Sequence, residues 1–481
     1  MGGVDMILHK NKVHLIYEEG NCIGLDIFNS TVFVVDELGS QILSRQKSEK
    51  KEDIISRLLF LGYKEKEIRD VINELIKVGL LNRNPASEPF DESENEIGEN
   101  ILGGISLNIS HKCNMKCGYC FGGGGSYNGP ASNMSWLVAK KAIDYFYSHC
   151  GNKKECLIGF FGGEPFMNWD VLKKSILYSE KKAKNRRIVY FVTTNATLLT
   201  KEYLQFLNQF NVKLVVSIDG PEFVHNKERR FISGKGSYYA VKNNIRKLSK
   251  FPNISVQARP TITPYASNFV SLIYRHIVLN LGIKRIHARS QSAYGLSRGL
   301  NNDECDKFSK GIEEAARWMV SAANNKEYIG IINVSKFINI LYFRITRQFH
   351  CGAGTSVLSF SPNGTIYPCP RFTGEQDFVL GNIQKNDFRD IRKVFFQNGV
   401  LRRPGCADCW AKYICGGGCY YMHWKKHGDI VKNDEDWCKT TRREIEIAMK
   451  AYLKIVSQKD RGQNFFSVFT PTFPSEFTEE K

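Results

Sequence analysis

The chain has 481 residues, of which 42% are hydrophobic and 24% charged, with a formal net charge of +18 and 14 cysteines. This length suggests about three domains, and the ordinary composition excludes a disordered or fibrous protein. No apolar run reaches the roughly 18 residues of a membrane helix, and the N-terminus lacks the apolar core of a secretion signal. We therefore expect a cytoplasmic protein without a membrane partner. There, cysteines predict metal ligands or reactive thiols rather than disulfides.

Residues 1–84 contain β-branched runs at 13–17, 22–27 and 31–36, followed by helical patterns at 37–45, 52–60 and 65–78. Strands followed by three helices resemble a winged helix. This region has 12 Lys and Arg against 13 Asp and Glu, about −1 net. DNA affinity depends on phosphate neutralisation, so we expect no nucleic-acid partner. A strand edge that captures an extended peptide fits better. The alternative is a packing domain without a ligand.

Residues 85–100 are acidic and polar, which is typical of a linker. From 101 to 345 strand-like runs alternate with helical stretches such as 136–150 and 237–249. The expected strands are 105–110, 156–161, 188–194, 213–218 and 254–262. This alternation predicts an α/β fold with parallel strands, a partial (β/α)6 TIM-like barrel. In such barrels the active site assembles at the strand C-termini.

Cys113, Cys117 and Cys120 follow the first of these strands with C-x3-C-x2-C spacing. Three thiolates on so short a loop suit one [4Fe–4S] cluster and leave one iron without a protein ligand. That iron could bind S-adenosylmethionine (SAM), which an electron from the cluster would cleave to a 5′-deoxyadenosyl radical. The alternative is zinc with His111 as a fourth ligand, although so short a loop would strain that site.

This cysteine loop, with Tyr119 before its last cysteine, resembles the radical SAM superfamily, as do four later segments at 160–168, 194–197, 217–221 and 225–237. The resemblance implies that the GGEP segment binds the SAM amine through its backbone and Glu164. It also implies contacts from the later segments to the ribose and carboxylate of SAM, with Arg229 or Arg230 as the carboxylate partner. The glycines at 122–125 would let the backbone approach the cofactor. The candidate SAM-binding residues are Tyr119, Gly162, Gly163, Glu164, Pro165, Asn195, Ser217, Asp219 and Arg229.

A second set of cysteines lies in the C-terminal third of the chain, and its spacing resembles the SPASM domain, which holds auxiliary iron–sulfur clusters. Its members are Cys351, Cys369, Cys406, Cys409, Cys415, Cys419 and Cys438. By this resemblance Cys406, Cys409, Cys415 and Cys438 hold one cluster, and Cys351, Cys369 and Cys419 hold the other. A zinc ribbon would explain four or eight cysteines better than seven.

Ile345 occupies the position where some sulfatase-maturating relatives have an extra cysteine. The three-cysteine cluster would therefore keep an open iron, for which a substrate thiolate is a natural soft ligand. The remaining cysteines, Cys22, Cys150, Cys156 and Cys305, are expected to be buried small hydrophobic residues.

The resemblances together predict a domain order: a RiPP recognition element-like winged helix (1–84), a linker (85–100), the radical SAM barrel (101–345), the SPASM domain (346–445), and a helix end with a loosely ordered tail (446–481). This order resembles sactipeptide and ranthipeptide maturases. It implies three [4Fe–4S] clusters, SAM, a precursor peptide whose leader the N-terminal domain binds, and an electron donor such as flavodoxin or ferredoxin.

The expected reaction is an intramolecular thioether link from a substrate cysteine to a carbon, with no side-chain base assigned. The alternatives are carbon–carbon crosslinking, a sulfatase-maturating type of enzyme, and a non-catalytic metal-binding regulator.

Overall fold

The computed structural model describes residues 7–8, 13–44, 49–81, 89–90, 101–291, 298–385, 387–388 and 392–456. The predicted linker lies outside these residues except for 89–90, and so does the tail after 456. The Phe90 ring lies 5.8 Å from the ring of Tyr413 in the cysteine-rich region. No described helix has the length and apolar character that crossing a membrane requires.

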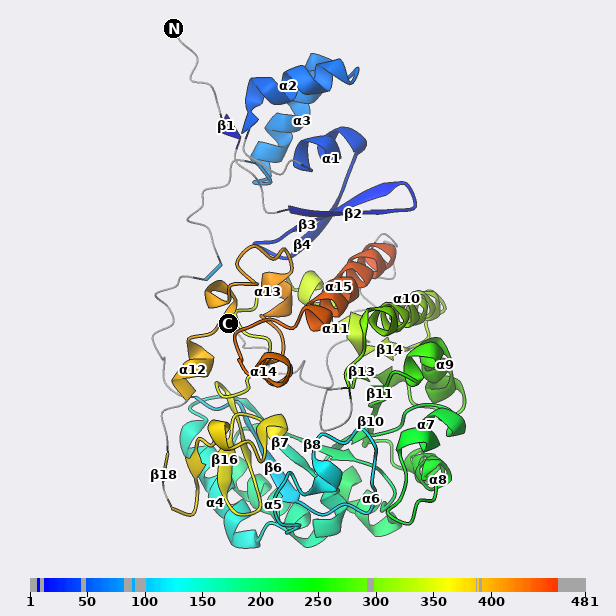
Figure 1. Cartoon of the computed structure of the whole chain (residues 1–481), viewed down its shortest axis with the longest axis vertical. Helices are drawn as coiled ribbons and strands as arrows, with labels where there is room; N and C mark the ends of the chain where they lie inside the picture. Colours follow the sequence, from blue (N-terminus) through cyan, green and yellow to red (C-terminus); the bar gives the residue numbers. More distant parts are fainter. Residues whose placement is uncertain are drawn as a thin grey trace.

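The N-terminal unit contains the three strands and three helices that the sequence predicts (Figure 1). The antiparallel strands are β2 (Val13–Glu18), β3 (Asn21–Asp26) and β4 (Thr31–Val35), in the order β2-β3-β4. The helices are α1 (Glu37–Leu43), α2 (Lys51–Phe60) and α3 (Glu65–Lys77). A short pair, β1 (Ile7–Leu8) and β5 (Glu49–Lys50), joins the chain start to α2.

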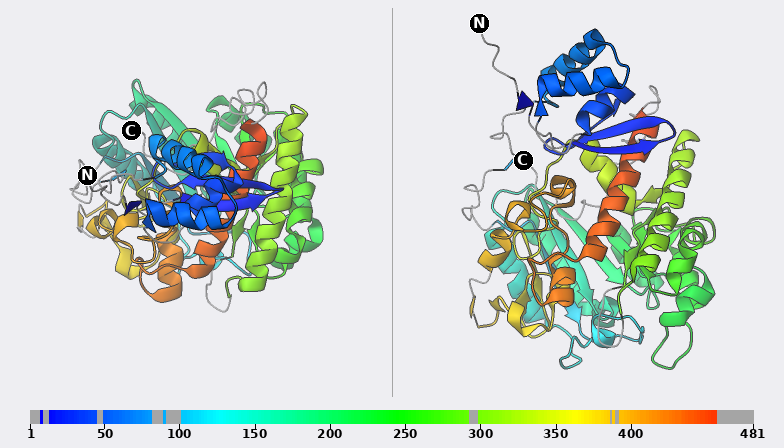
Figure 2. Two further views of the ribbon diagram at one scale, coloured as in Figure 1. Left: turned by 90° about the horizontal axis from the view of Figure 1, so that it is seen from above. Right: turned by 45° about the horizontal axis from the view of Figure 1, so that its top comes forward.

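Alternation along these strands gives the small sheet two apolar faces. Leu15 and Phe33 pack against the three helices, whereas Ile16, Ile23 and Leu25 join the main hydrophobic core of the chain. Both views in Figure 2 show the blue N-terminal unit against the red helix α15 (Glu435–Val456). The unit is therefore packed onto the rest of the chain through its sheet.

The central region forms a parallel sheet in the order β14-β12-β10-β9-β8-β7-β6. Its strands are β6 (Gly104–Ser110), β7 (Glu155–Gly162), β8 (Arg187–Thr194), β9 (Lys213–Val216), β10 (Ser255–Ala258), β12 (Arg285–Ile286) and β14 (Gly330–Ile331). The helices along it are α4 (Trp136–His149), α5 (Trp169–Ala183), α6 (Lys201–Gln209), α7 (Glu222–Glu228), α8 (Tyr238–Leu248), α9 (Val270–Leu279), α10 (Asn302–Asn324) and α11 (Ile332–Tyr342). The predicted parallel α/β alternation is confirmed.

The sheet does not close on itself among the described strands. Beyond β6 it continues through β15 (Val357–Phe360), which is parallel to β6, and then through antiparallel β16 (Thr365–Tyr367), β17 (Gly381–Asn382) and β18 (Asp387–Phe388). The strands of the cysteine-rich region thus extend the parallel sheet of the central region rather than forming a separate sheet.

Two sequence expectations differ from the structure at the β14 side of the sheet. The predicted strand 254–262 is divided into β10 and β11 (Thr261–Ile262), because Pro260 has no N–H to donate to a ladder. β11 pairs instead with β13 (Arg289–Ser290). β12 and β14 were not predicted, since two residues are too few to show a periodic pattern.

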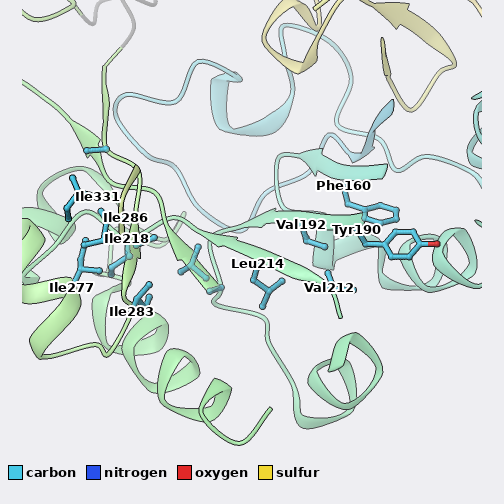
Figure 3. Close-up of a cluster of buried hydrophobic side chains, with 14 of the residues drawn as sticks. Phe160, Tyr190, Val192, Val212, Leu214, Ile218, Ile277, Ile283, Ile286 and Ile331 are labelled. Carbon is cyan, nitrogen blue, oxygen red and sulfur yellow. The ribbon is translucent and has the colours of Figure 1, made fainter. Parts of the chain in front are cut away.

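The core lies between this sheet and its helices, and Figure 3 shows part of it. Phe160, Val192, Leu214 and Ile286, from four different strands, have no exposed surface. Burial of these side chains fixes the register of the strands and hence the positions of the loops that follow them.

Short helices and the long helix α15 complete the cysteine-rich region. They are α12 (Lys393–Phe396), α13 (Lys412–Cys415) and α14 (Tyr420–His427). Helix α15 continues through residue 445, where the sequence places the end of the SPASM domain. Its Lys450 Nζ lies 2.6 Å from Glu18 Oε2 of β2, and its Arg443 pairs with Glu313 of α10 at 2.8 Å. Helix α15 of the cysteine-rich region therefore contacts both the N-terminal unit and the central region.

Candidate SAM and iron–sulfur sites

The three cysteines of the first motif lie on the loop that follows β6. The Met115 N–H donates to Cys113 Sγ at 3.4 Å. Burial, with smaller contributions from Glu164 and the nearby thiols of Cys117 and Cys120, raises the pKa of Cys113 to about 12. Burial likewise raises the pKa of Cys117, to about 11, against the opposing charge of Arg229. The fold brings the thiols together where a bound cation would favour their ionised form.

A second segment runs antiparallel along this loop. The N–H groups of Lys116 and Gly118 donate to the carbonyls of Arg230 and Glu228, at 2.9 and 3.2 Å. The Ile232 N–H donates to Asn114 O at 3.3 Å. The stretch 225–237, which resembled a recurring family segment, therefore forms one wall of the cysteine loop.

The chemistry of the donor set suits a cluster better than a single zinc ion. Among the residues that the structure describes, no three His, Cys, Asp or Glu side chains are close enough to share one ion. A four-iron cluster binds each thiolate at a different iron, so its cysteines lie farther apart than the ligands of one ion. The His111 ring lies 4.9 Å from that of Tyr127, and burial lowers its pKa to about 4.

The GGEP loop packs directly against the start of the cysteine loop. The Gly163 N–H donates to Ser110 O at 2.7 Å, and the Glu164 N–H to Lys112 O at 2.9 Å. A Cβ on Gly163 would clash with the Lys112 carbonyl, so only glycine permits this approach. Pro165 is buried at the first position of the short helix that follows.

Glu164, for which the resemblance implies a contact with the SAM amine, accepts three hydrogen bonds within the described structure. Its Oε1 accepts from Phe166 N–H at 3.1 Å and from Thr194 Oγ1 at 2.9 Å, and its Oε2 accepts from Asn195 N–H at 2.8 Å. The side chain has no exposed surface, and burial raises its pKa to about 7. Glu164 therefore joins the ends of β7 and β8, and the glycine backbone is the better candidate for holding the SAM amine.

Asn195 connects the end of β8 to the cysteine loop. Its Nδ2 donates to Asn114 Oδ1 at 2.9 Å and lies 3.9 Å from Cys113 Sγ. Ser217, at the next strand end, is half-buried, and its N–H donates to Thr194 O at 2.9 Å. Asn114 was not singled out from the sequence, although an amide between two cluster cysteines is a usable signal.

Tyr119, Asp219 and Arg229 form one buried polar network. The Tyr119 hydroxyl donates to Asp219 Oδ2 at 2.6 Å, and Arg229 Nη1 donates to the same hydroxyl at 2.6 Å. Asp219 Oδ1 accepts from Thr261 N–H at 2.9 Å. Burial raises the pKa of Asp219, and the positive charge of Arg229 opposes that shift. All three residues were named from the sequence, but their contact was not predicted.

Arg229 is the better of the two arginine candidates for a carboxylate partner. It is buried, and its Nε has no hydrogen-bond partner within the described structure. Arg230 is exposed, and its Nε donates to Asn226 O at 2.9 Å. His225 supports this wall, because its Nε2 lies 2.8 Å from Ser237 Oγ, which donates to Arg229 O at 2.9 Å.

The cysteines of the C-terminal region fall into the two groups that the sequence predicts. Burial raises the pKa of Cys415 to about 11, with further contributions from Cys406 and Cys409. The pKa of Cys438 is raised by burial and then by Cys415. Cys406 also lies beside Asn433, whose Nδ2 is 3.5 Å from its sulfur. The thiols of this group therefore lie close enough to affect one another's pKa, near the start of α15. They are Cys406, Cys409, Cys415 and Cys438.

The second group lies in an aromatic cluster at the other side of α14. Cys351, Cys369 and Cys419 pack against a core that includes Phe372 and Tyr420. Burial raises the pKa of Cys369 to about 12, with Cys419 as the next contribution. Ile345, where some relatives have a further cysteine, packs in the main core instead. In the described part of the chain, this group thus contains three thiols.

Side chains of the cysteine-rich region reach the cluster loop of the barrel. The Arg371 guanidinium lies 5.4 Å from the Phe121 ring and 5.7 Å from the Tyr421 ring. Thr373 Oγ1 accepts from Asn108 Nδ2 at 2.6 Å. This junction was not predicted from the sequence, although an asparagine in the fully buried strand β6 was a possible signal.

A pocket of about 270 Å³ lies between the barrel and the cysteine-rich region. Arg289 and Ser290 of β13, Leu300 before α10, Met422 of α14 and Trp437 of α15 contribute to its lining. β13 pairs with β11, whose Thr261 binds Asp219. The pocket therefore lies next to the strand pair that holds Asp219, and α14, which contributes Met422, begins directly after Cys419.

The four remaining cysteines, Cys22, Cys150, Cys156 and Cys305, are buried, as expected. Burial raises the pKa of Cys156 to about 12, so this thiol remains protonated at neutral pH.

Comparison with known proteins identifies two domains. Residues 107–259 match the model of the radical SAM superfamily, and residues 351–410 match that of the SPASM iron–sulfur cluster-binding domain. The radical SAM cyclopropyl synthase TigE of Paramaledivibacter caminithermalis is 25% identical over 82% of this chain and 84% of its own length. AlbA, an antilisterial bacteriocin subtilosin biosynthesis protein of Bacillus subtilis, is 24% identical over 70% and 72%. Other relatives are anaerobic sulfatase-maturating enzymes.

Solved structures share the fold. Native anSMEcpe with bound AdoMet has a TM-score of 0.63 at 19% identity, covering 74% of this chain and 99% of the other. Streptococcus suis SuiB bound to the precursor peptide SuiA has a TM-score of 0.53 at 16% identity, covering 90% and 100%. Residues 107–259 thus form a radical SAM domain and residues 351–410 a SPASM domain, and the chain is an enzyme whose cofactors are SAM and three [4Fe–4S] clusters.

Proposed function

We propose that this enzyme makes intramolecular thioether links between cysteines and carbon atoms of a ribosomally made precursor peptide. The observation that carries the proposal is the group of three thiols, Cys351, Cys369 and Cys419, with Ile345 packed elsewhere. Three thiols leave one iron of a four-iron cluster available to an outside ligand. A substrate thiolate is a soft ligand of the kind such a position favours, and metal binding would release its proton.

When bound in the barrel, SAM would supply a 5′-deoxyadenosyl radical that takes one hydrogen atom from the acceptor carbon. As the carbon–sulfur bond forms with the deprotonated thiolate, the one electron left over would pass to the auxiliary cluster. Cys113, Cys117 and Cys120 would hold the cluster that supplies the electron. The backbone of Gly162 and Gly163 would hold the amine of SAM. Arg229 would orient its carboxylate, with Tyr119 and Asp219 fixing the guanidinium.

The pocket at the junction is where we expect the modified segment of the peptide. It is lined by β13 on one side and by α14 and α15 on the other. A peptide there would lie between β13, which pairs with the strand that holds Asp219, and α14, which begins after Cys419. Holding both reactants on rigid elements supplies the proximity on which such coupling depends.

The N-terminal unit is a candidate site for the leader of the peptide. The β2 side of its sheet is occupied by α15, where His14 Nε2 lies 3.2 Å from Glu446 Oε1. β4 has no strand partner on its outer side among the described strands, and its Val34 is 58% exposed. An extended leader could add to this edge as a strand. SuiB, which shares the fold, has been solved with a precursor peptide.

The test is mass spectrometry of a co-expressed cysteine-rich precursor from the neighbouring reading frames. Each crosslink removes two hydrogens, about 2 Da. Thioether formation predicts one cysteine protected from iodoacetamide for every crosslink. A product that has lost hydrogens while every cysteine remains alkylatable contradicts it.

Carbon–carbon bond formation is a second candidate, favoured by the similarity to TigE, whose name describes a cyclopropyl synthase. The alkylation experiment separates the two reactions, because only the thioether consumes a thiol. For either reaction we place the enzyme in the cytoplasm, with flavodoxin or ferredoxin as its electron donor.

A further inference from the structure

The outer surface of the cysteine loop carries exposed positive charge that the proposed reaction does not use. We call it the cluster-loop face and define it by Lys112, Lys116, Lys227, Arg230 and Lys235, all of which are exposed. None of these five side chains forms an ion pair within the described structure. Lys227 lies over the Tyr265 ring at 5.6 Å, and Arg230 donates to a backbone carbonyl.

This lack of ion pairing sets the face apart from a second basic surface on the outer helices. There Lys140 pairs with Asp144 at 3.0 Å, Lys174 with Asp170 at 2.8 Å, and Arg187 of β8 with Glu155 at 3.0 Å. On the cluster-loop face the nearby acids are Glu222 and Glu228. Glu228 is half-buried, and its carboxylate lies so close to Gly118 that an added Cβ there would clash with it. The face thus has excess positive charge directed to solvent.

The face also lies directly over the first cysteine motif. Lys116 lies beside Cys117, and backbone hydrogen bonds join Lys116 to Arg230. Cys117 itself is only partly buried, so this motif lies close to the surface of the face. Electron transfer between proteins falls steeply with distance, which favours docking where the cluster is nearest the surface.

Exposed apolar side chains border the charges. Ile232, at the tip of the turn between Phe231 and Lys235, is 68% exposed, and Phe223 of α7 is 49% exposed. A small apolar centre with a charged rim is typical of transient protein interfaces, and electron-transfer complexes are among the smallest of these.

We propose that the cluster-loop face docks an acidic one-electron carrier protein, such as a flavodoxin. The inference rests on the proposed function only in taking the cluster to be held by Cys113, Cys117 and Cys120. One electron passes from the reduced carrier to the cluster. The carrier is oxidised by one electron, the cluster is reduced by one, and no bond is made or broken. The opposite charges raise the association rate at low ionic strength.

The test compares two double variants of the full-length holoenzyme. Lys227→Glu with Lys235→Glu reverses charge on the cluster-loop face. Lys154→Glu with Lys181→Glu reverses the same charge at the opposite ends of the strands, at two exposed lysines that likewise form no ion pair with any described residue. The probe is purified oxidised flavodoxin, whose Kd is measured at low and at high salt.

We expect the first variant to weaken flavodoxin binding about tenfold or more at low salt, which corresponds to about 1.4 kcal/mol. The control should stay within about twofold, and added salt should bring the two together. A carbodiimide should crosslink flavodoxin carboxylates to Lys227 or Lys235 in the unmodified enzyme, as identified by mass spectrometry. Equal Kd values for both variants, or crosslinks elsewhere, overturn the proposal.

Dithionite separates this inference from the proposed function. Dithionite is a small reductant that needs no docking surface, so SAM cleavage driven by it should be equal in all three proteins. Flavodoxin-driven cleavage should fall only in the first variant. If the first variant loses affinity for the precursor peptide and keeps its affinity for flavodoxin, the face binds peptide and the inference is wrong. Failure of thioether formation with intact flavodoxin binding contradicts the proposed function alone.

Discussion

The two kinds of cysteine site in this chain are built in different ways. Around Cys113, Cys117 and Cys120, polar side chains from successive strand ends form a continuous hydrogen-bonded network that includes Glu164, Asn195 and Asp219. Around Cys369 and Cys419 the surroundings are aromatic rings and loop backbone. The first surroundings suit a site that binds a polar cofactor in one orientation. The second suit a cluster shielded from water, with access at one position.

The largest effect is expected for Cys117→Ala. With two thiols left on the loop, the first cluster should be lost, and SAM cleavage should be undetectable. Iron content should fall from about 12 to about 8 per chain. Cys305→Ala, which removes a buried cysteine outside these groups, is the matched control and should keep both. Retained SAM cleavage in Cys117→Ala would mean that the cofactor is activated elsewhere.

Cys419→Ala separates the two sites. SAM cleavage should stay within about threefold of the unmodified enzyme, because the network around Asp219 is untouched. Crosslinked peptide should disappear, since the three-thiol group is broken. Both quantities come from one assay, by counting 5′-deoxyadenosine and product masses. A variant that still forms crosslinks would contradict the proposed role of the three-thiol group.

Arg229→Met and Tyr119→Phe measure how much each side chain of the polar network contributes to stability and to SAM binding. Arg229→Met removes the donor to the Tyr119 hydroxyl and the nearby positive charge that favours the ionised form of Asp219, at a cost of about 1.5–3 kcal/mol. It should lower Tm and weaken SAM binding by about 100-fold or more. Tyr119→Phe removes the hydroxyl that bridges Arg229 and Asp219, at a cost of about 1.5–3 kcal/mol in stability, but it keeps the positive charge at position 229 and should weaken SAM binding much less. Calorimetry and SAM titration measure both, and equal effects on SAM binding would show that the charge at position 229 has no special role.

The smallest effect is expected for Arg371→Gln, at the junction of the two sites. Losing its contacts with Phe121 and Tyr421 removes about 1–2 kcal/mol of cation–π interaction. Crosslinking should slow by a few-fold while SAM cleavage is unchanged. Arg275→Gln, which removes an arginine of α9 that lies over the Trp318 ring of α10, away from this junction, serves as the control. A loss of SAM cleavage would place Arg371 among the residues that shape the first site.

The contrast also explains what the sequence could predict. The strands β6 to β9 are short runs rich in apolar residues, and the cysteine spacings are read directly from the sequence. Both could therefore be predicted. The contact between Asn108 and Thr373 spans 265 residues, and no periodicity reports it. Glu164 was assigned to the cofactor because its motif was visible, whereas its burial among three donors became evident only in three dimensions.

Helix α15 has a consequence for how substrates would be chosen. Because its Lys450 and Glu446 hold strand β2, the N-terminal unit sits at a set distance from the junction pocket. For a precursor anchored at its leader, that fixed span would determine which residues are modified. Only residues at a set number of positions after the leader would reach the junction pocket. Lengthening the peptide between the leader and the modified residue should therefore move the modification along the sequence.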